Sequence, residues 1–330
     1  MREILEKIGK IGIIPVIKID DADNAVPLAR ALDAGGIPCV EITFRTAAGE
    51  ESIRRIAREA PGMLLGAGTV LSIDQADRAI SAGAQFIMSP GLNPKVVGHC
   101  VEKDIPIIPG CATPSDIEQA LEFGLSAVKF FPAEQAGGIE YIKAVSAPYP
   151  NVRFIPTGGI NARNIRHYLA FDKVLACGGS WMAGADLIAA RDFEKITALS
   201  REALMSLLDM RVTHTGINAD SEEAALKAAN FFAALFGFSV TNSEPSVFAG
   251  DSIEIVRRGG QGTQGHIAQG HNAHGHIAVG TSDITRALAY LERSGVELDY
   301  DSALRDSGGA VRGIYLKEEI LGFAVRLLST

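Results

Sequence analysis

One lysine lies in surroundings that suit nucleophilic chemistry. Lys129 stands beside Val128 and two phenylalanines, within the apolar run Ala127–Phe131. An unpaired ammonium is costly in such surroundings, so burial favours the neutral amine. A neutral amine in an apolar pocket can attack a carbonyl to form a carbinolamine and then an imine. Lys129 is therefore a candidate Schiff-base nucleophile, and the alternative is a lysine held in a salt bridge inside the protein.

Three other polar residues could serve the same chemistry. Glu41 stands between two branched apolar residues, so its carboxylate is predicted to be internal and could move protons to and from a bound substrate. Arg45 could hold a substrate carboxylate through its planar guanidinium, and Thr69 could add a hydroxyl hydrogen bond. The alternatives are a structural ion-pair partner for Glu41, a solvated charge for Arg45 and a simple turn residue for Thr69.

Two glycine clusters could bind an anion. Gly158–Gly159 and Gly178–Gly179–Ser180 each follow an apolar run and are expected to precede a helix. Glycine lets backbone N–H groups approach an anion closely, and the first turn of a helix favours negative charge. The two clusters together predict a site for a phosphate group.

The elements that must position these residues alternate regularly. Helical segments separate eight apolar runs that are too short to be helices, as expected for the buried strands of a parallel sheet. The helical segments include Asn24–Asp33, Glu51–Glu59, Ile73–Ala82, Pro94–Lys103, Pro114–Phe123 and Arg163–Ala170, with Asp192–Leu208 after the last strand. The runs are Ile13–Ile19, Ile37–Phe44, Leu64–Ala67, Phe86–Met88, Ile105–Ile108, Ala127–Phe131, Val152–Ile155 and Val174–Ala176.

This alternation predicts an α/β fold, a (β/α)8 TIM barrel over residues 1–208. Active sites of such barrels lie at the C-terminal ends of the strands, and phosphate sites often follow strands seven and eight. Lys129, Glu41, Arg45 and Thr69 would therefore converge at one end of the barrel, with both glycine clusters beside them.

Residues 211–330 contain one order of elements twice, with a boundary near 208–212. We predict a smaller α+β domain of two βαβββ-like repeats. A segment rich in glycine, histidine and glutamine at 259–275 separates the copies, and we interpret it as a surface loop. Each copy has a strand with a leading histidine, a helix and further strands: RVTHTGI (211–217), Ser221–Phe236 and pieces ending in DSIEIV (251–256), then HIAVG (276–280), Asp283–Ser294 and pieces ending in FAVRLL (323–328).

Composition excludes several classes of function. Hydrophobic residues make up 47% and charged residues 21% of the 330 residues, as in water-soluble globular proteins. The net charge of −8 argues against nucleic acid or an anionic membrane as a partner. The four scattered cysteines and the charged N-terminal segment suggest reduced thiols and no secretory signal, so we expect a cytoplasmic protein.

The first ~205 residues resemble the family of 2-keto-3-deoxy-6-phosphogluconate (KDPG) aldolases, which overlaps with the 4-hydroxy-2-oxoglutarate (KHG) aldolases. The resemblance spans nearly every expected strand end in order. It rests on VEITFRT (40–46), GAGTV (66–70), QFIMSPG (85–91), IPGCATPSD (108–116), VKFFPAE (128–134), RFIPTGGI (153–160) and CGGSW (177–181).

The resemblance implies a cofactor-free class I aldolase, usually a homotrimer. Its reaction is cleavage of KDPG to pyruvate and glyceraldehyde 3-phosphate. The alternatives are cleavage of KHG, which gives pyruvate and glyoxylate, and cleavage of both substrates. By position, Lys129 would be the Schiff-base lysine and Glu41 the general acid and base. The pyruvyl part would be held by Arg45, Thr69 and Pro90, and the phosphate by Gly158, Gly159, Gly179 and Ser180.

Residues 211–330 resemble another family, the glyoxalase-like vicinal oxygen chelate domains. The matching stretches are HTGIN (214–218), GDSIEIV (250–256), HIAVGTSDI (276–284) and LGFAVRLL (321–328). That family often binds a divalent metal through one ligand from each of four strands. His214, Glu254 and His276 could supply three ligands here, but Arg326 stands at the fourth position and argues against metal catalysis.

Three hypotheses follow for this second part. It could be an auxiliary domain of the aldolase, a second enzyme with a metal-assisted step, or a module that binds an effector or forms oligomers. Arg326 favours the first and the third, because it could neutralise Glu254 or bind an anionic ligand. The loop histidines His266, His271 and His274 are interpreted as surface residues rather than metal ligands.

Overall fold

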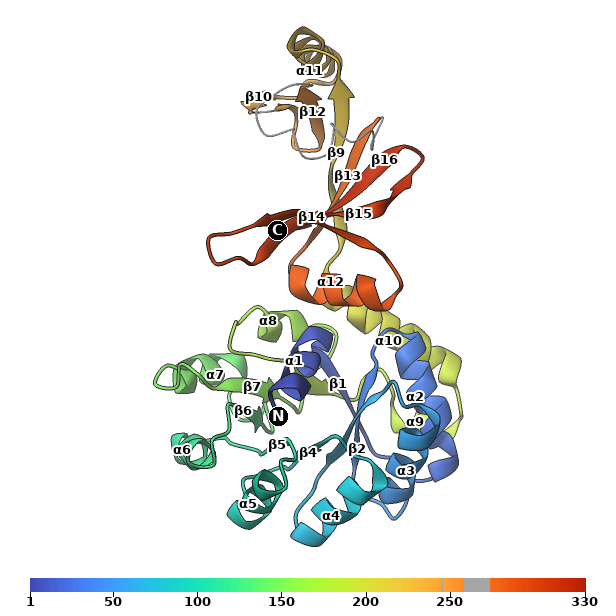
Figure 1. Ribbon diagram of the computed structural model, residues 1–330, viewed down its shortest axis with the longest axis vertical. Helices are drawn as coiled ribbons and strands as arrows, with labels where there is room; N and C mark the ends of the chain where they lie inside the picture. Colours follow the sequence, from blue (N-terminus) through green and yellow to red (C-terminus); the bar gives the residue numbers. More distant parts are fainter. Residues whose placement is uncertain (245, 258–273) are drawn as a thin grey trace. The chain divides into compact units, whose positions relative to one another are not determined.

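The computed structural model describes residues 1–244, 246–257 and 274–330 (Figure 1). Most of the glycine-, histidine- and glutamine-rich segment, with His266 and His271, lies outside these ranges. The described chain divides into two compact units, Met1–Leu207 and Leu208–Thr330. None of the described helices is long and apolar enough to cross a membrane.

Parallel strands form the centre of the first unit. Six of them pair in the order β5-β4-β3-β2-β1-β8, and β6 pairs with β7. Parallel bridges from Gly110 to Lys129 and from Thr157 to Gly178 join the two groups, which gives a curled parallel sheet of TIM-barrel type. The strands are β1 (Ile13–Ile17), β2 (Cys39–Thr43), β3 (Leu64–Gly68), β4 (Phe86–Met88), β5 (Ile107–Ile108), β6 (Ala127–Phe130), β7 (Arg153–Pro156) and β8 (Cys177–Gly179).

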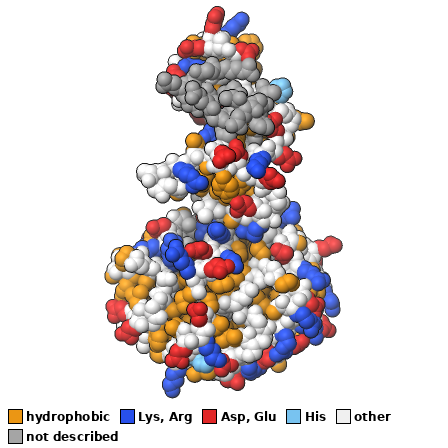
Figure 2. Space-filling view, in the orientation of Figure 1, with side chains coloured by type: hydrophobic (Ala, Val, Ile, Leu, Met, Phe, Trp, Pro, Cys, Tyr) orange, Lys and Arg blue, Asp and Glu red, His pale blue; other side chains and the backbone are white. Residues whose placement is uncertain are grey.

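Amphipathic helices surround this sheet (Figure 1). Most of their apolar residues are buried, while acidic and basic side chains are interspersed on the face of the molecule seen in Figure 2. Thr113 and Asp116 form a capping box at the start of α6, which fixes where that helix begins. The helices are α1 (Arg2–Ile11), α2 (Ala25–Ala34), α3 (Gly49–Glu59), α4 (Ile73–Ala82), α5 (Pro94–Glu102), α6 (Pro114–Glu122), α7 (Gly138–Ser146), α8 (Ile165–Leu169), α9 (Ala185–Ala189) and α10 (Phe193–Leu208).

The structure corrects the sequence prediction at the eighth strand. We placed that strand at Val174–Ala176, but β8 is Cys177–Gly179. Val174 forms only an isolated bridge to Phe154. Two glycines are a poor signal for a strand, so the apolar residues before them misled the prediction. Gly178 and Gly179 therefore belong to the strand, and neither glycine cluster leads directly into a helix.

The described residues of the second unit form one eight-stranded sheet, in the order β10-β11-β12-β9-β13-β16-β15-β14. Its two central strands, β9 and β13, are antiparallel to each other, and each pairs in parallel with the last strand of its own half. The elements are β9 (Arg211–Ala219), α11 (Glu222–Phe236), β10 (Val240–Ser243), β11 (Ser246–Ala249), β12 (Ile253–Arg257), β13 (Gly275–Thr281), α12 (Ile284–Arg293), β14 (Leu298–Arg305), β15 (Val311–Ile320) and β16 (Phe323–Ser329).

Helix α11 covers one face of this sheet. Ala225 and Ala229 of the helix pack with Val247, Ala249 and Ile255 of β11 and β12 in a buried apolar cluster. Side chains alternate between the two faces along a strand. The even-numbered side chains of β11 and β12 therefore lie on the face opposite α11.

Candidate active site and a second polar cluster

Lys129 and Glu41 meet inside the curled sheet of the first unit. Lys129 Nζ lies 3.2 Å from Glu41 Oε1, and the two residues are 5% and 0% exposed. Their strands, β6 and β2, are not neighbours, so the side chains meet across the interior because the sheet curls. The sequence alone left open whether the lysine was free or paired, and the structure shows that it is paired.

Glycines make the room for this pair. A methyl group on Gly68 would lie 1.9 Å from Glu41 Oε1, so the carboxylate packs directly against the backbone of β3. The other carboxylate oxygen of Glu41 is buried without a hydrogen-bond partner among the described residues. An unpartnered buried carboxylate oxygen is costly, and it is free to accept a proton or a hydrogen bond from a bound molecule.

The backbone around Lys129 ties β6 to the end of β5. Its N–H donates to the carbonyl of Pro109, and its carbonyl accepts from the N–H of Cys111. The Lys129 ammonium nitrogen also lies 5.7 Å from the centre of the Phe131 ring. The lysine is therefore held by both its backbone and its side chain, which limits the positions that its amine can take.

The expected binding residues lie just beyond the strand ends. Arg45 is exposed, two residues after β2, whereas Thr69 and Pro90 are half-buried. Thr69 follows β3 with a φ of 56°, a conformation that is strained for a β-branched residue. Such strain often occurs at functional positions. A methyl group on Gly110 would lie 2.0 Å from the Pro90 carbonyl oxygen, so Gly110 lets these two loops approach each other.

The predicted phosphate-binding residues occupy the ends of β7 and β8. Gly158 and Gly159 have φ angles of 103° and 80°, which glycine adopts without strain. The N–H of Glu134 donates to the Gly158 carbonyl, and this bond links the segment after β6 to the segment after β7. Ser180 is exposed, immediately after β8.

Two polar features near these strand ends were absent from the sequence prediction. The hydroxyl oxygen of Thr157 is buried without a hydrogen-bond partner among the described residues, and it faces Gly178 at close range. The Tyr168 hydroxyl donates to Glu134. A threonine next to a glycine pair is a weak sequence signal, so only the fold brings out this position.

All four cysteines are free and buried, as the sequence analysis predicted. Burial is the main cause that raises the pKa of Cys111 to about 12 and that of Cys100 to about 11. Thiols with such pKa values are almost entirely protonated at neutral pH. Cys100 and Cys111 are thus poor nucleophiles.

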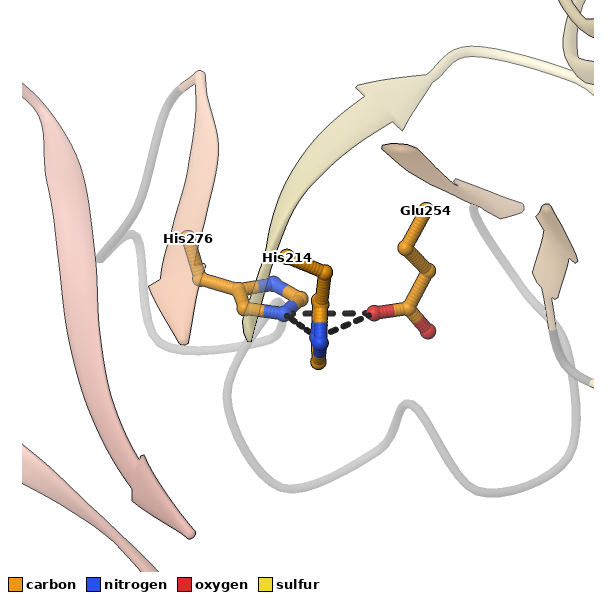
Figure 3. Close-up of side chains that lie close together, drawn as sticks. All are labelled: His214, Glu254 and His276. Atoms are coloured by element: carbon orange, nitrogen blue, oxygen red, sulfur yellow. Dashed lines mark hydrogen bonds and ion pairs between the residues drawn. The ribbon is translucent and has the colours of Figure 1, made fainter. Parts of the chain in front are cut away.

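The second unit contains a separate polar cluster, drawn in Figure 3. His214, Glu254 and His276 come from β9, β12 and β13, and their side chains point toward one another. Glu254 Oε2 lies 3.2 Å from each histidine Nε2, and the two Nε2 atoms are also 3.2 Å apart. A methyl group on Gly216 would lie 2.2 Å from the His276 ring, so a glycine at this position leaves room for the ring.

The surroundings of this cluster favour an ionised carboxylate. Burial alone would raise the pKa of Glu254, but hydrogen bonds with His214, His276 and Ser246 hold it well below its usual range. Ser246 Oγ donates to Glu254 Oε1 at 2.6 Å, which leaves Oε2 for the histidines. The cluster thus presents one carboxylate oxygen and two imidazole nitrogens to a common point.

Comparisons with known proteins concern the first unit. Residues 4–199 match the family model described as "KDPG and KHG aldolase". A 2-dehydro-3-deoxy-phosphogluconate aldolase of Treponema pallidum is 53% identical over 204 residues, which are 62% of this chain and 97% of that protein. A KHG/KDPG aldolase of Escherichia coli is 45% identical over 192 residues, 58% of this chain and 90% of its own length.

A solved structure agrees with these matches. The KDPG aldolase of Legionella pneumophila, crystallised with pyruvate captured as a covalent carbinolamine, is 38% identical. It superposes with a TM-score of 0.59, over 60% of this chain and 97% of that one. The family model spans more than half of the 330 residues. Through this first unit, the chain belongs to the KDPG and KHG aldolase family.

Proposed function

We propose that the first unit is a class I aldolase that cleaves KDPG into pyruvate and glyceraldehyde 3-phosphate. The observation that carries the proposal is the buried pair of Lys129 and Glu41, 3.2 Å apart. An amine and a carboxylate at this distance can exchange a proton, and the exchange leaves a neutral amine in an apolar site.

The pair can perform each step of the cleavage. The Lys129 amine attacks the C2 carbonyl of the substrate, and the resulting carbinolamine loses water, with Glu41 donating the proton, to give an imine. Glu41 then takes the proton of the C4 hydroxyl while the C3–C4 bond breaks, and its electrons pass into the imine to form an enamine. Glyceraldehyde 3-phosphate leaves as the aldehyde. Protonation of the enamine at C3 and hydrolysis of the imine release pyruvate and restore Lys129.

The binding residues follow from position and chemistry. We assign the substrate carboxylate to Arg45 and Thr69, with Pro90 against the pyruvyl group, because these residues lie within two positions of the ends of β2, β3 and β4. An exposed guanidinium is free to engage both oxygens of a carboxylate. We assign the phosphate to Gly158, Gly159, Gly179 and Ser180, at the ends of β7 and β8.

The alternative substrate is KHG, whose cleavage gives pyruvate and glyoxylate. The two substrates share the pyruvyl half and differ in the phosphate, so kcat/KM for each, measured as pyruvate release by the full chain, decides between them. We expect KDPG to be preferred. Ser180→Ala should raise the KM for KDPG about tenfold or more, as expected for the loss of one hydrogen bond to a charged group.

Two controls accompany this measurement. Ser180→Ala should leave kcat/KM for KHG unchanged, because KHG has no phosphate. Ser81 is an exposed serine within α4, and Ser81→Ala should leave kcat/KM unchanged for both substrates. Preference for KHG, together with equal effects of Ser180→Ala on both substrates, would refute the phosphate assignment.

For the second unit we propose a tandem glyoxalase-like domain that binds a divalent metal at His214, Glu254 and His276. The support is the order of its elements, a strand, a helix and three strands in each half, together with the three converging ligand atoms. The three atoms lie 3.2 Å from one another, so two imidazoles and a carboxylate would together hold one divalent metal ion. An effector-binding or assembly module without a metal is the alternative.

The two proposed sites predict different responses to a chelator. EDTA treatment followed by desalting should remove metal from the second unit and leave kcat for aldol cleavage within twofold, because an imine withdraws electrons without a metal. Metal content and pyruvate release, measured on the same sample before and after treatment, check this result. Loss of cleavage that returns on adding a divalent metal would contradict a metal-independent mechanism.

A further inference from the structure

We infer that Arg326 makes the metal cluster of the second unit a binding site for a small carboxylate, held between the metal and the guanidinium. The inference rests on the metal site proposed above and deepens it, because it names the class of ligand. Its basis is a cation on the same face of the sheet as the cluster, without an acidic partner.

Strand register places Arg326 beside the cluster. Arg326 lies opposite Ala278, which lies opposite His214 on the other side of β13. Residues that are directly opposite across a ladder share a face of the sheet, as do residues two apart on one strand. Ala278 is two residues after His276, and Tyr315 lies opposite Arg326. All of these side chains therefore lie on one face, Arg326 on the strand next to β13 and Tyr315 on the strand beyond it.

The side chain of Arg326 is held in place but not neutralised. Its Nε is buried without a hydrogen-bond partner among the described residues, and its guanidinium carbon lies 5.3 Å from the centre of the Tyr315 ring. The Tyr315 ring in turn lies 6.2 Å from the His276 ring. The Arg326 side chain also hydrogen-bonds the Tyr315 hydroxyl, and among the ion pairs of the described residues none joins Arg326 to a carboxylate. A buried donor without a protein partner is open to an acceptor from a bound molecule.

The charge of the loaded site selects an anion. A divalent metal, the carboxylate of Glu254 and the guanidinium of Arg326 sum to a net charge of +2 (two plus one minus one). The three protein ligands lie on one side of the metal, so coordination positions remain open on the other side. A carboxylate can bind there through one oxygen and accept from the planar guanidinium through the other.

A carboxylate fits this site better than a phosphate does. Phosphates are commonly held by backbone N–H groups at the start of a helix or in a glycine-rich loop. The groups assembled here are side chains on strands, whose backbone groups belong to the sheet ladder. Phosphate therefore serves as the contrasting probe in the test.

The test uses the full chain loaded with Co2+, whose visible absorption reports on the coordination of the metal. It is performed on the Lys129→Met variant, so that pyruvate cannot form an imine in the first unit. We expect one Co2+ to bind per chain and pyruvate to change the spectrum saturably. Arg326→Ala should weaken pyruvate binding about tenfold or more, the loss of a charge-assisted hydrogen bond, and leave the Co2+ affinity within threefold.

Control variants separate the possible failures. Arg312→Ala on β15, an exposed arginine, should change neither affinity, and Arg326→Lys should restore part of the pyruvate binding. Absence of Co2+ binding, or Co2+ binding that survives both His276→Ala and Glu254→Gln, would refute the metal site itself. Unchanged pyruvate binding by folded Arg326→Ala would refute only the role of Arg326, and tighter binding of phosphate than of pyruvate would refute the carboxylate ligand.

Discussion

Replacing Lys129 by methionine is expected to lower kcat for aldol cleavage by about 10⁴-fold or more, the scale seen when a covalent nucleophile is removed. Lys129 supplies the nitrogen of the proposed imine, and no other lysine can replace it, because Glu41 lies 3.2 Å from this amine inside the curled sheet. The variant should also lose the adduct that borohydride traps with pyruvate, which mass spectrometry of the intact chain detects.

Two further variants show whether the loss is chemical. Lys129→Arg keeps a cation beside Glu41 but cannot form a neutral imine, so it should be as inactive as Lys129→Met. Lys143→Met, at an exposed lysine of α7, should keep full activity. A pyruvate adduct that persists after borohydride treatment of Lys129→Met would place the nucleophile elsewhere.

Stability must be measured beside activity for this pair. Removal of one partner of a buried ion pair commonly costs about 3–5 kcal/mol, because a buried charge is left without compensation. Lys129→Met leaves the buried carboxylate of Glu41 without its compensating cation, unless the carboxylate takes up a proton. The free energy of unfolding of each variant, from denaturant titration, therefore separates loss of chemistry from loss of the fold.

Much of the first unit could be predicted from sequence, because buried parallel strands are nearly continuous apolar runs. Seven of the eight predicted runs overlap the strands observed. The eighth, Val174–Ala176, was wrong because β8 consists of a cysteine and two glycines, and its place is decided by pairing with β1. Helices α1, α7 and α9 were not among the predicted segments either. Helix α7 begins at Gly138, and this residue and its N-cap Gly137 both have positive φ, a weak start signal in sequence.

The contacts within the sites could not be predicted to the same extent. The sequence indicated that Lys129 and Glu41 would lie at the same end of a barrel, but a contact across the interior depends on the curl of the whole sheet. The sequence does not indicate the role of Gly68, because only the structure shows which side chain occupies the space beside it. In the second unit, Arg326 stands at the position of the fourth metal ligand. The sequence alone could not show that the other three candidate ligands converge.

Gly68→Ala is expected to lower kcat by about 10²-fold, although Gly68 carries no side chain that could take part in the reaction. The added methyl group would lie 1.9 Å from Glu41 Oε1, so the carboxylate must move away from the amine of Lys129. A displacement of about 1 Å in a catalytic group is enough for a loss of this size. The φ angle of Gly68 is not in the left-handed region, so alanine is compatible with the backbone. The steady-state rate of pyruvate release and the melting temperature are the two measurements.

Two other glycines of the same segment make this result specific. Gly62→Ala adds a methyl group with nothing within 4 Å and should change neither rate nor stability. Gly66→Ala would place its methyl group 2.2 Å from the Phe86 ring, so it should lower the melting temperature through overpacking with a smaller loss of kcat. If folded Gly68→Ala kept kcat within threefold, the position of the Glu41 carboxylate could not be essential. A selective loss in Gly68→Ala would instead show that the backbone of β3 fixes the proton donor of the reaction, because the three substitutions differ only in which neighbour the methyl group meets.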